Sequence, residues 1–232
     1  MSLSAADDAQ FQRASDQSLL ICFGQEITLD AHERVRKLLQ LLESEPLAGI
    51  RNLHPAYCSV LVKFDALKWR HEELEQLLGK YLHRLQDVTL PETRQVEIPV
   101  CYGGEHGPDL EEVGALHAMT PQQVIDLHSS TTYFVYFLGF VPGFAYLGEL
   151  PKPLVTPRLP TPRRSVPPGS VGIAGSQTGV YPVATPGGWR LLGRTPMSLF
   201  QPNQNGLSLL SIGDRVRFHS ISAKQFAALE RA

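Results

Sequence analysis

The 232-residue sequence has only three cysteines and no long apolar run. The cysteines, Cys22, Cys58 and Cys101, are far apart and form no CxxC pair, which is typical of buried free thiols in a reducing compartment. No stretch approaches the roughly 18 apolar residues that a membrane-spanning helix needs. The first residues also lack the basic start and apolar core of a secretion signal. We therefore expect a cytoplasmic protein without membrane contact, whose residues 1–16 form a disordered tail.

Familiar signatures of metal and cofactor binding are also missing. The eight histidines form no HExxH or H-x-H pair, so no metal site is predicted. The glycines of GSVGIAGSQTG (169–179) contain no G-x-G, which argues against a dinucleotide site. In GGWRLLGRT (187–195) an arginine, Arg194, stands where a phosphate-binding loop requires lysine. The sequence has no Met-Lys biotin-attachment motif and no ATP-binding signature.

Acidic residues are absent from residues 150–213, which hold Lys152 and five arginines. Residues 1–149 hold 21 acidic and 11 basic residues, so the charge is unevenly distributed although the net charge is only −2. One interpretation is that these arginines pair with acids elsewhere in the chain. The other is a groove that attracts a carboxylate or a phosphate. Nucleic acid is not an expected partner, because the basic segment is poor in lysine and has an acidic neighbour.

Helix and strand signals alternate over the first hundred residues. A strand at 18–24 precedes a helix at about 31–43, which Asp30 and Glu33 would begin as a capping box. Two strands follow within 50–64, then a helix capped by Asp65, then an alternating strand at 94–100. The order β-α-β-β-α-β predicts a split βαβ, ferredoxin-like domain over residues 17–100.

Two short helices, at about 110–118 and 121–129, predict a helical connector over residues 101–130. Asp109 with Glu112 would cap the first, and Thr120 with Gln123 the second. From Thr131 the helical period disappears, and proline and glycine become dense. This pattern predicts a compact, closed or nearly closed β-domain over residues 131–232, and an α+β fold for the whole chain.

Few residues near the predicted β-domain could act as a general acid or base. Because residues 150–213 contain no acid, a general base would have to be His128, Glu149, Asp214 or a group of a partner protein. His128 ends a predicted helix, where a structural hydrogen bond is the simpler interpretation. His128 and Glu149 are therefore the catalytic candidates of this chain.

Three long blocks resemble a known family: IPVCYGGEHGPDLEEV (98–113), LHSSTTYFVYFLGFVPGFAYLGELP (127–151) and PRRSVPPGSVGIAGSQTGVYPVATPGGWRLLGRTP (162–196). They are similar to the family of 5-oxoprolinase B subunits, also called the KipI-like family, many of whose members carry the older label allophanate hydrolase subunit 1. The resemblance implies a ferredoxin-like α/β domain followed by a cyclophilin-like β-barrel. It also implies a heteromeric complex with a homologous C subunit, together with an A subunit, which opens 5-oxo-L-proline to L-glutamate.

Carboxyltransferase relatives work on a carboxyl group delivered by biotin, but this chain has neither a biotin-attachment motif nor an ATP-binding signature. We therefore expect ATP to be used by the assembled complex rather than bound by this chain alone, without biotin and without a metal. Two other functions stay open within the family: inhibition of a sensor histidine kinase, and a role in a urea- or allophanate-metabolising carboxyltransferase complex. The barrel's likeness to cyclophilin also suggests a proline isomerase, although a shared fold does not carry a shared site.

The stretch FLGFVPGFAYLGELP (137–151) is the predicted centre of a site for a small carboxylate. Its glycines and proline would turn the backbone sharply, and its aromatic side chains would wall a pocket. The alternative is that these aromatics plug the barrel or seat it on the first domain. The candidate substrate-binding residues are Phe140, Gly143, Phe144, Tyr146, Arg158, Arg163, Gln177, Thr178, Tyr181, Gly187, Gly188, Trp189 and Arg194, with Arg158, Arg163 or Arg194 holding the anion.

Overall fold

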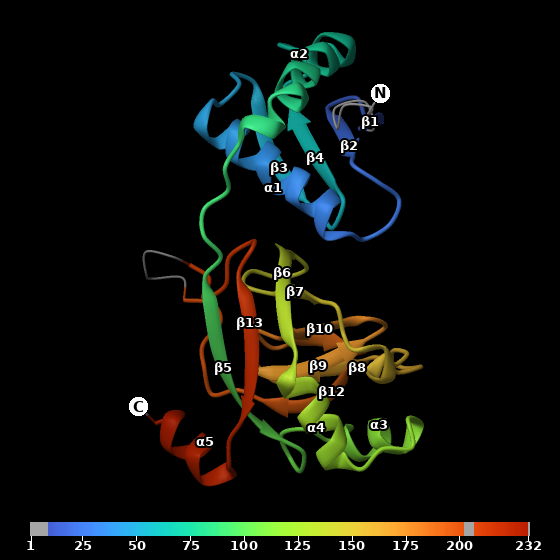
Figure 1. Cartoon of the computed structure of the whole chain (residues 1–232), viewed down its shortest axis with the longest axis vertical. Coiled ribbons are helices and arrows are strands. Elements are labelled where there is room, and N and C mark those ends of the chain that lie inside the picture. The colour runs from blue at the N-terminus through green and yellow to red at the C-terminus, as the bar shows by residue number, and fades with distance from the viewer. Residues whose placement is uncertain (1–8, 202–206, 232) are drawn as a thin grey trace. The chain divides into compact units, whose positions relative to one another are not determined.

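The computed structural model describes residues 9–201 and 207–231 and divides the chain into two compact units, Met1–Glu92 and Thr93–Ala232 (Figure 1). Both units combine helices with antiparallel strands, so the chain belongs to the expected α+β class. None of the helices in the described part of the chain combines the length and the apolar character that a membrane crossing needs.

The first unit is a four-stranded antiparallel sheet, in the order β1-β2-β4-β3, with two packed helices. The central strands bury Leu19, Ile21, Val60 and Val62 completely, because alternate side chains point to the same face of a strand. The elements are β1 (Gln10–Ser15), β2 (Ser18–Cys22), α1 (Leu29–Ser44), β3 (Ile50–Pro55), β4 (Ser59–Phe64), α2 (His71–His83) and the 3-10 turn η1 (Leu85–Asp87).

The edge of this sheet differs from the expectation in two ways. The strand expected at 94–100 does not join it: β5 (Gln95–Tyr102) pairs with strands of the second unit instead. Residues 10–15, expected in a disordered tail, form β1 and pair along β2. The ferredoxin-like order of residues 17–100 is therefore incomplete, and the remainder of the expected tail, residues 1–8, lies outside the described residues. Alternation identified the 94–100 strand but could not tell which sheet it joins.

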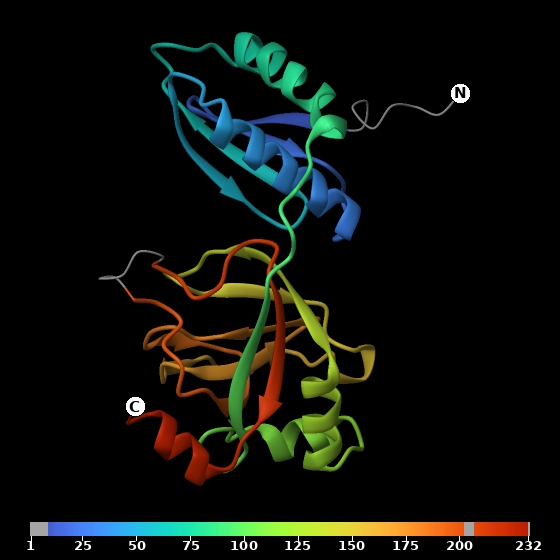
Figure 2. The same ribbon diagram turned by 60° about the vertical axis from the view of Figure 1, so that its left-hand side comes forward.

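The second unit is built around a closed seven-stranded barrel, as the dense turns predicted. The strand order is β10-β7-β6-β13-β5-β12-β9, in which β5 runs parallel to β13. Figures 1 and 2 show β5 and β13 side by side along the barrel wall. The strands are β5, β6 (Thr132–Leu138), β7 (Ala145–Gly148), β9 (Ser170–Ala174), β10 (Gln177–Val180), β12 (Arg190–Arg194) and β13 (Arg215–Ser220), beside a two-stranded sheet of β8 (Arg163–Val166) and β11 (Thr185–Gly187).

The expected helical connector lies inside this second unit rather than between the two units. Its helices are α3 (Leu110–Leu116) and α4 (Pro121–Ser130), and they pack against β12 and β13 at one end of the barrel (Figure 2). The unit also contains η2 (Lys152–Leu154) and α5 (Ala223–Leu229). The expected boundary at residue 101 differs from the observed one at residues 92 and 93, because β5 belongs to the barrel.

The helix starts show which capping signals could be recognised in the sequence. Thr120 accepts from the backbone N–H of Gln123 and begins α4 as expected. In α1, however, Thr28 rather than Asp30 accepts from the N–H of Ala31. Asp65 does not cap a helix either, because it accepts from the N–H of Leu67 in a turn. Neighbouring Thr and Asp residues are both good caps, so sequence alone did not select between them.

Asp109 stands at the start of α3 but fastens the helix to the barrel instead of capping it. The residue is buried, with 5% exposed. One carboxylate oxygen accepts from Nη2 of Arg163 at 2.6 Å, and the other accepts from the backbone N–H of Leu191 at 2.7 Å. The N–H of Asp109 in turn donates to the carbonyl of Leu191 at 3.1 Å. One residue thereby connects α3, β8 and β12.

We predict that Asp109→Ala lowers the free energy of unfolding by about 2–4 kcal/mol, because it leaves the Leu191 N–H and the Arg163 guanidinium without their acceptor. Urea unfolding followed by circular dichroism measures the effect. Glu111→Ala, which removes an exposed carboxylate from the same helix, is the matched control and should leave the unfolding free energy within about 0.5 kcal/mol of wild type. Equal losses for the two variants would contradict the role of Asp109.

Candidate functional site

An aromatic pocket of about 250 Å³ lies in the second unit. It is formed by the loop before β7, the segment before β8, and the region around β11 and the start of β12. Phe144 is its centre, because its ring meets four other aromatic rings edge-on at centroid distances of 5.0–5.5 Å. The lining residues are Phe140, Phe144, Tyr146, Arg158, Pro162, Tyr181, Pro186, Gly187, Gly188 and Trp189.

Phe140 occupies a strained turn at the rim of this pocket. The N–H of Val141 donates to the carbonyl of Gly139 at 2.9 Å, which closes a γ-turn around Phe140 with φ at +71°. This backbone conformation is unfavourable for a residue with a side chain and costs about 1–3 kcal/mol. The turn holds a large aromatic ring 59% exposed beside Phe144. A ring kept exposed at such a cost is typical of a binding surface.

The hydroxyl groups of the pocket belong to Tyr146 and Tyr181. Burial raises the pKa of Tyr146, and the nearby Arg158 guanidinium offsets part of that rise. Burial also raises the pKa of Tyr181, against smaller opposing effects of a hydrogen bond with the backbone of Trp189 and of the charges of Arg158 and Arg163. Both hydroxyls therefore stay protonated near neutral pH and can donate hydrogen bonds.

Most arginines of the acid-free segment are already paired. Arg163 binds Asp109, and Arg190 binds Glu112 at 2.7 Å. For these two residues the simpler interpretation, pairing with acids elsewhere in the chain, is confirmed.

Arg194 lies away from the aromatic pocket. Its Nε donates to the carbonyl of Pro168 at 2.8 Å, its Nη2 is 3.8 Å from Glu230, and its guanidinium lies over the Phe226 ring. Of the three arginines predicted to hold an anion, Arg158 is therefore the one that lines the pocket, whereas Arg163 and Arg194 are engaged elsewhere.

Three other predicted substrate-binding residues do not line the pocket either. Gly143 has φ at +82° and packs so closely on Phe200 that an added Cβ would lie 2.7 Å from that side chain. Gln177 begins β10, outside the lining set. Thr178 is completely buried inside the barrel. Pro162 and Pro186 also line the pocket and were not predicted, although Pro186 directly precedes the predicted glycine pair.

The catalytic candidate His128 lies in the barrel core rather than at the pocket. It is 0% exposed and stacks on Phe218. Thr178 donates its hydroxyl to the carbonyl of Gly172, so its oxygen can accept from Nε2–H of His128 at 2.9 Å. The hydroxyl of Tyr102 then donates to Nδ1 at 2.8 Å. Both nitrogens of a neutral imidazole are thus satisfied, and burial lowers the pKa of His128 to about 3.

The second catalytic candidate, Glu149, is exposed at the end of β7 and does not line the aromatic pocket. Burial raises the pKa of Tyr136, and the charge of Glu149 adds to this rise, so the carboxylate lies near that side chain. The ten residues that line the pocket include no carboxylate, imidazole or thiol. The pocket can therefore bind a ligand, but it has no side chain suited to act as a general base near neutral pH.

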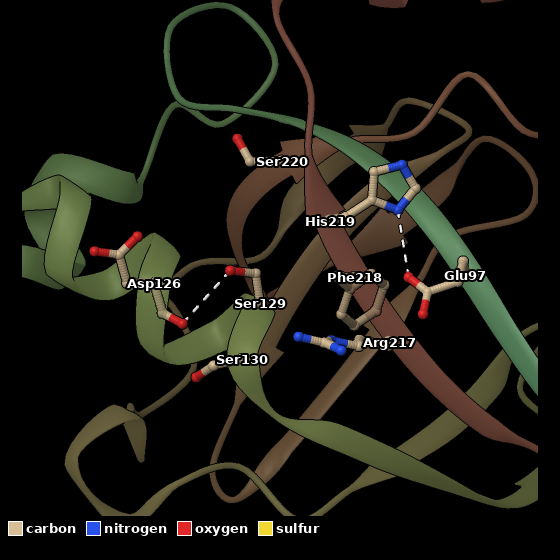
Figure 3. Close-up of a pocket in the computed structure, with 8 residues that line it drawn as sticks. All are labelled: Glu97, Asp126, Ser129, Ser130, Arg217, Phe218, His219 and Ser220. Carbon is tan, nitrogen blue, oxygen red and sulfur yellow. Dashed lines mark hydrogen bonds and ion pairs between the residues drawn. The ribbon is translucent and has the colours of Figure 1, made fainter.

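A second, polar pocket of about 400 Å³ lies on the outside of the barrel between α4, β5 and β13 (Figure 3). Its acidic groups already have partners: Glu97 lies 3.6 Å from His219, and Asp126 accepts from Gln122 at 2.7 Å. This pocket was not predicted, although basic and apolar residues alternate in the RVRFHS segment of β13. The lining residues are Glu97, Asp126, Ser129, Ser130, Arg217, Phe218, His219 and Ser220.

Metal ligands do not gather in the described part of the chain. Within residues 9–201 and 207–231 there is no group of three or more His, Cys, Asp or Glu side chains placed to hold an ion.

Known proteins resemble the chain over nearly its whole length. The family model of the carboxyltransferase domain, subdomain C and D, matches residues 9–210. The B subunit of the Bacillus subtilis 5-oxoprolinase is 42% identical over 229 residues, which cover 94% of this chain and 95% of the relative. The corresponding protein of Escherichia coli O157:H7 is 45% identical over 203 residues, 83% of this chain and 87% of the relative.

A solved structure, that of TTHA0988, superposes with a TM-score of 0.79 at 36% identity and covers 89% of this chain. The match spans 40% of the TTHA0988 chain. The closed barrel and the aromatic pocket are therefore features of a carboxyltransferase-type domain, by fold and by sequence. The chain belongs to the carboxyltransferase subdomain C and D family, in the group that contains the B subunits of 5-oxoprolinases.

The buried His128 predicts a defined pH dependence of stability. Its pKa is about 3 in the folded protein and about 6.5 in the unfolded chain. Only the unfolded chain takes up this proton between these values, so the stabilisation present above pH 6.5 is lost as the pH falls towards 3. His128→Gln should flatten the plot of unfolding free energy against pH in this window by up to about 1.4 kcal/mol per pH unit. Parallel plots for wild type and variant would disprove the assignment.

We expect the two glycines that line the pocket to differ in how well they tolerate replacement by alanine. A Cβ on Gly187 would lie 2.5 Å from the Tyr181 hydroxyl, whereas the nearest atom to a Cβ on Gly188 is 3.6 Å away, in Pro162. Gly187→Ala should lower the unfolding free energy by about 1–3 kcal/mol through overpacking, and Gly188→Ala, the matched control, should stay within about 0.5 kcal/mol of wild type. Thermal unfolding of the two variants tests this, and equal losses would argue against the close approach of Gly187 to Tyr181.

Proposed function

We propose that this chain is the B subunit of an ATP-dependent 5-oxoprolinase, which converts 5-oxo-L-proline to L-glutamate together with its A and C subunits. The observation that carries this proposal is the 42% identity with the Bacillus subtilis protein over 95% of that protein's length. The aromatic pocket supports it, because it offers one guanidinium and two protonated hydroxyls to a small polar ligand.

The lack of a base in the pocket supports a role as one member of a complex. In the proposed reaction, the lactam oxygen takes the γ-phosphoryl group of ATP and ADP leaves. Water then adds to the activated carbon, the C–N bond breaks with a proton passing to the nitrogen, and phosphate leaves as the carboxylate of glutamate forms. A base has to take a proton from that water. Since the pocket lining holds no carboxylate or imidazole and the sequence has no ATP-binding signature, we assign ATP use and proton transfer to the assembled complex. The cytoplasm, which supplies ATP, is the expected location.

The test is glutamate formation from 5-oxo-L-proline by this chain co-purified with its candidate A and C subunits. We expect glutamate from the complete mixture with ATP, and none when this chain or ATP is left out. An assembled complex that forms no glutamate would contradict the proposal. Urea-dependent ATP use by that complex would then favour the carboxyltransferase alternative, and tight binding to a sensor histidine kinase, unaffected by 5-oxoproline, would favour the inhibitor alternative.

A further inference from the structure

Arg158 is a cation at the aromatic pocket without a counter-charge. Within the described residues it forms neither an ion pair nor a hydrogen bond, in contrast to Arg163, Arg190 and Arg194, which each have an acidic neighbour. Its side chain is exposed at the pocket, and its charge acts on the hydroxyls of Tyr146 and Tyr181. An exposed guanidinium whose planar fork is unoccupied suits a carboxylate.

The walls of the pocket select for a small ring. Its volume of about 250 Å³ is below the roughly 300–1,000 Å³ of sites for drug-sized ligands. Phe144, Tyr181 and Trp189 are nearly buried and present edge-on rings, whereas Phe140 extends its exposed ring from the strained turn at the rim. A ligand ring lying against Phe140 would remove that aromatic surface from water, which favours binding.

Gly187, the last residue of β11, lines the pocket beside Tyr181. A Cβ at Gly187 would lie 2.5 Å from the Tyr181 hydroxyl, so the missing side chain lets β11 pack closely against that hydroxyl. The proline neighbours, Pro162 and Pro186, have no N–H to offer. Besides Arg158, the side-chain donors in the pocket lining are the hydroxyls of Tyr146 and Tyr181 and the indole N–H of Trp189, a set that suits an acceptor such as a lactam carbonyl.

From this arrangement we propose that the aromatic pocket binds a small cyclic carboxylate, with the ligand's carboxylate on Arg158 and its ring against Phe140 and Phe144. That the ligand is 5-oxo-L-proline rests on the proposed function, whereas the class of ligand rests on the pocket itself. Arg158 is then the residue that distinguishes the acid from the corresponding neutral lactam.

The experiment compares two probes by isothermal titration on the purified full chain: 5-oxo-L-proline, and 2-pyrrolidinone, which has the same ring without the carboxylate. We expect Arg158→Ala to weaken 5-oxoproline binding about 10- to 100-fold, because a charge-assisted hydrogen-bonded contact is lost. Arg158→Lys should restore part of the affinity, since it keeps the charge but not the fork. Arg164→Ala, which removes an exposed arginine of β8 outside the pocket lining, is the matched control and should change affinity by less than about twofold.

A second measurement, the KM for 5-oxoproline of the complex assembled with each variant, separates this inference from the proposed function. If the complex forms glutamate and Arg158→Ala leaves both KM and affinity unchanged, the site is wrong and the function stands. If the complex forms no glutamate but the isolated chain binds 5-oxoproline through Arg158, the site stands and the function is wrong. Equal binding of 2-pyrrolidinone and 5-oxoproline, or no binding in the chain and an unchanged KM in the complex, would also overturn the site.

Discussion

The hydrogen bonds of the buried Asp109 carboxylate are the interactions on which the packing of α3 against the barrel depends. The carboxylate accepts from the Arg163 side chain and from the Leu191 backbone, and these groups lie in segments far apart along the chain. Through them it ties the start of α3 to β8 and β12, which flank the aromatic pocket. It also pairs with Arg163, which leaves Arg158 as the arginine in the pocket lining that has no acidic neighbour among the described residues. A single buried acid thus contributes to the barrel's cohesion and to the charge of its site.

Local sequence signals predicted a helix or a strand correctly where a single capping residue or a simple alternation determines it. The Thr120 cap placed α4 correctly, and alternation in residues 94–100 marked a strand. The assignment of that strand failed because Ile98 and Val100 fit any buried sheet face, and only pairing with β13 places them in the barrel. The N-terminal strand β1 was missed for a related reason. Most of its residues are exposed, so it carries no hydrophobic alternation.

The candidate site was predicted in part. Phe140, Phe144 and Tyr146 come together with Tyr181, Gly187, Gly188 and Trp189, since aromatic residues beside sharp turns tend to gather where loops meet. The arginines could not be ranked from the sequence. Their partners, Asp109 and Glu112, lie far earlier in the chain, and nothing local indicates which guanidinium an acid will reach. His128 directly precedes two serines at the end of its helix, a polar setting that suggests exposure, yet the fold turns it inward.

The parallel pairing of β5 with β13 has a consequence for the order of folding during synthesis. The first unit has all its strands once residue 64 has been made, and its sheet joins strands that are close in sequence. The barrel, by contrast, joins its first strand to its last, about 120 residues later. Until β13 leaves the ribosome, β5 has an unpaired edge that exposes hydrogen-bonding groups and apolar side chains. A nascent barrel therefore stays open until β13 has been made.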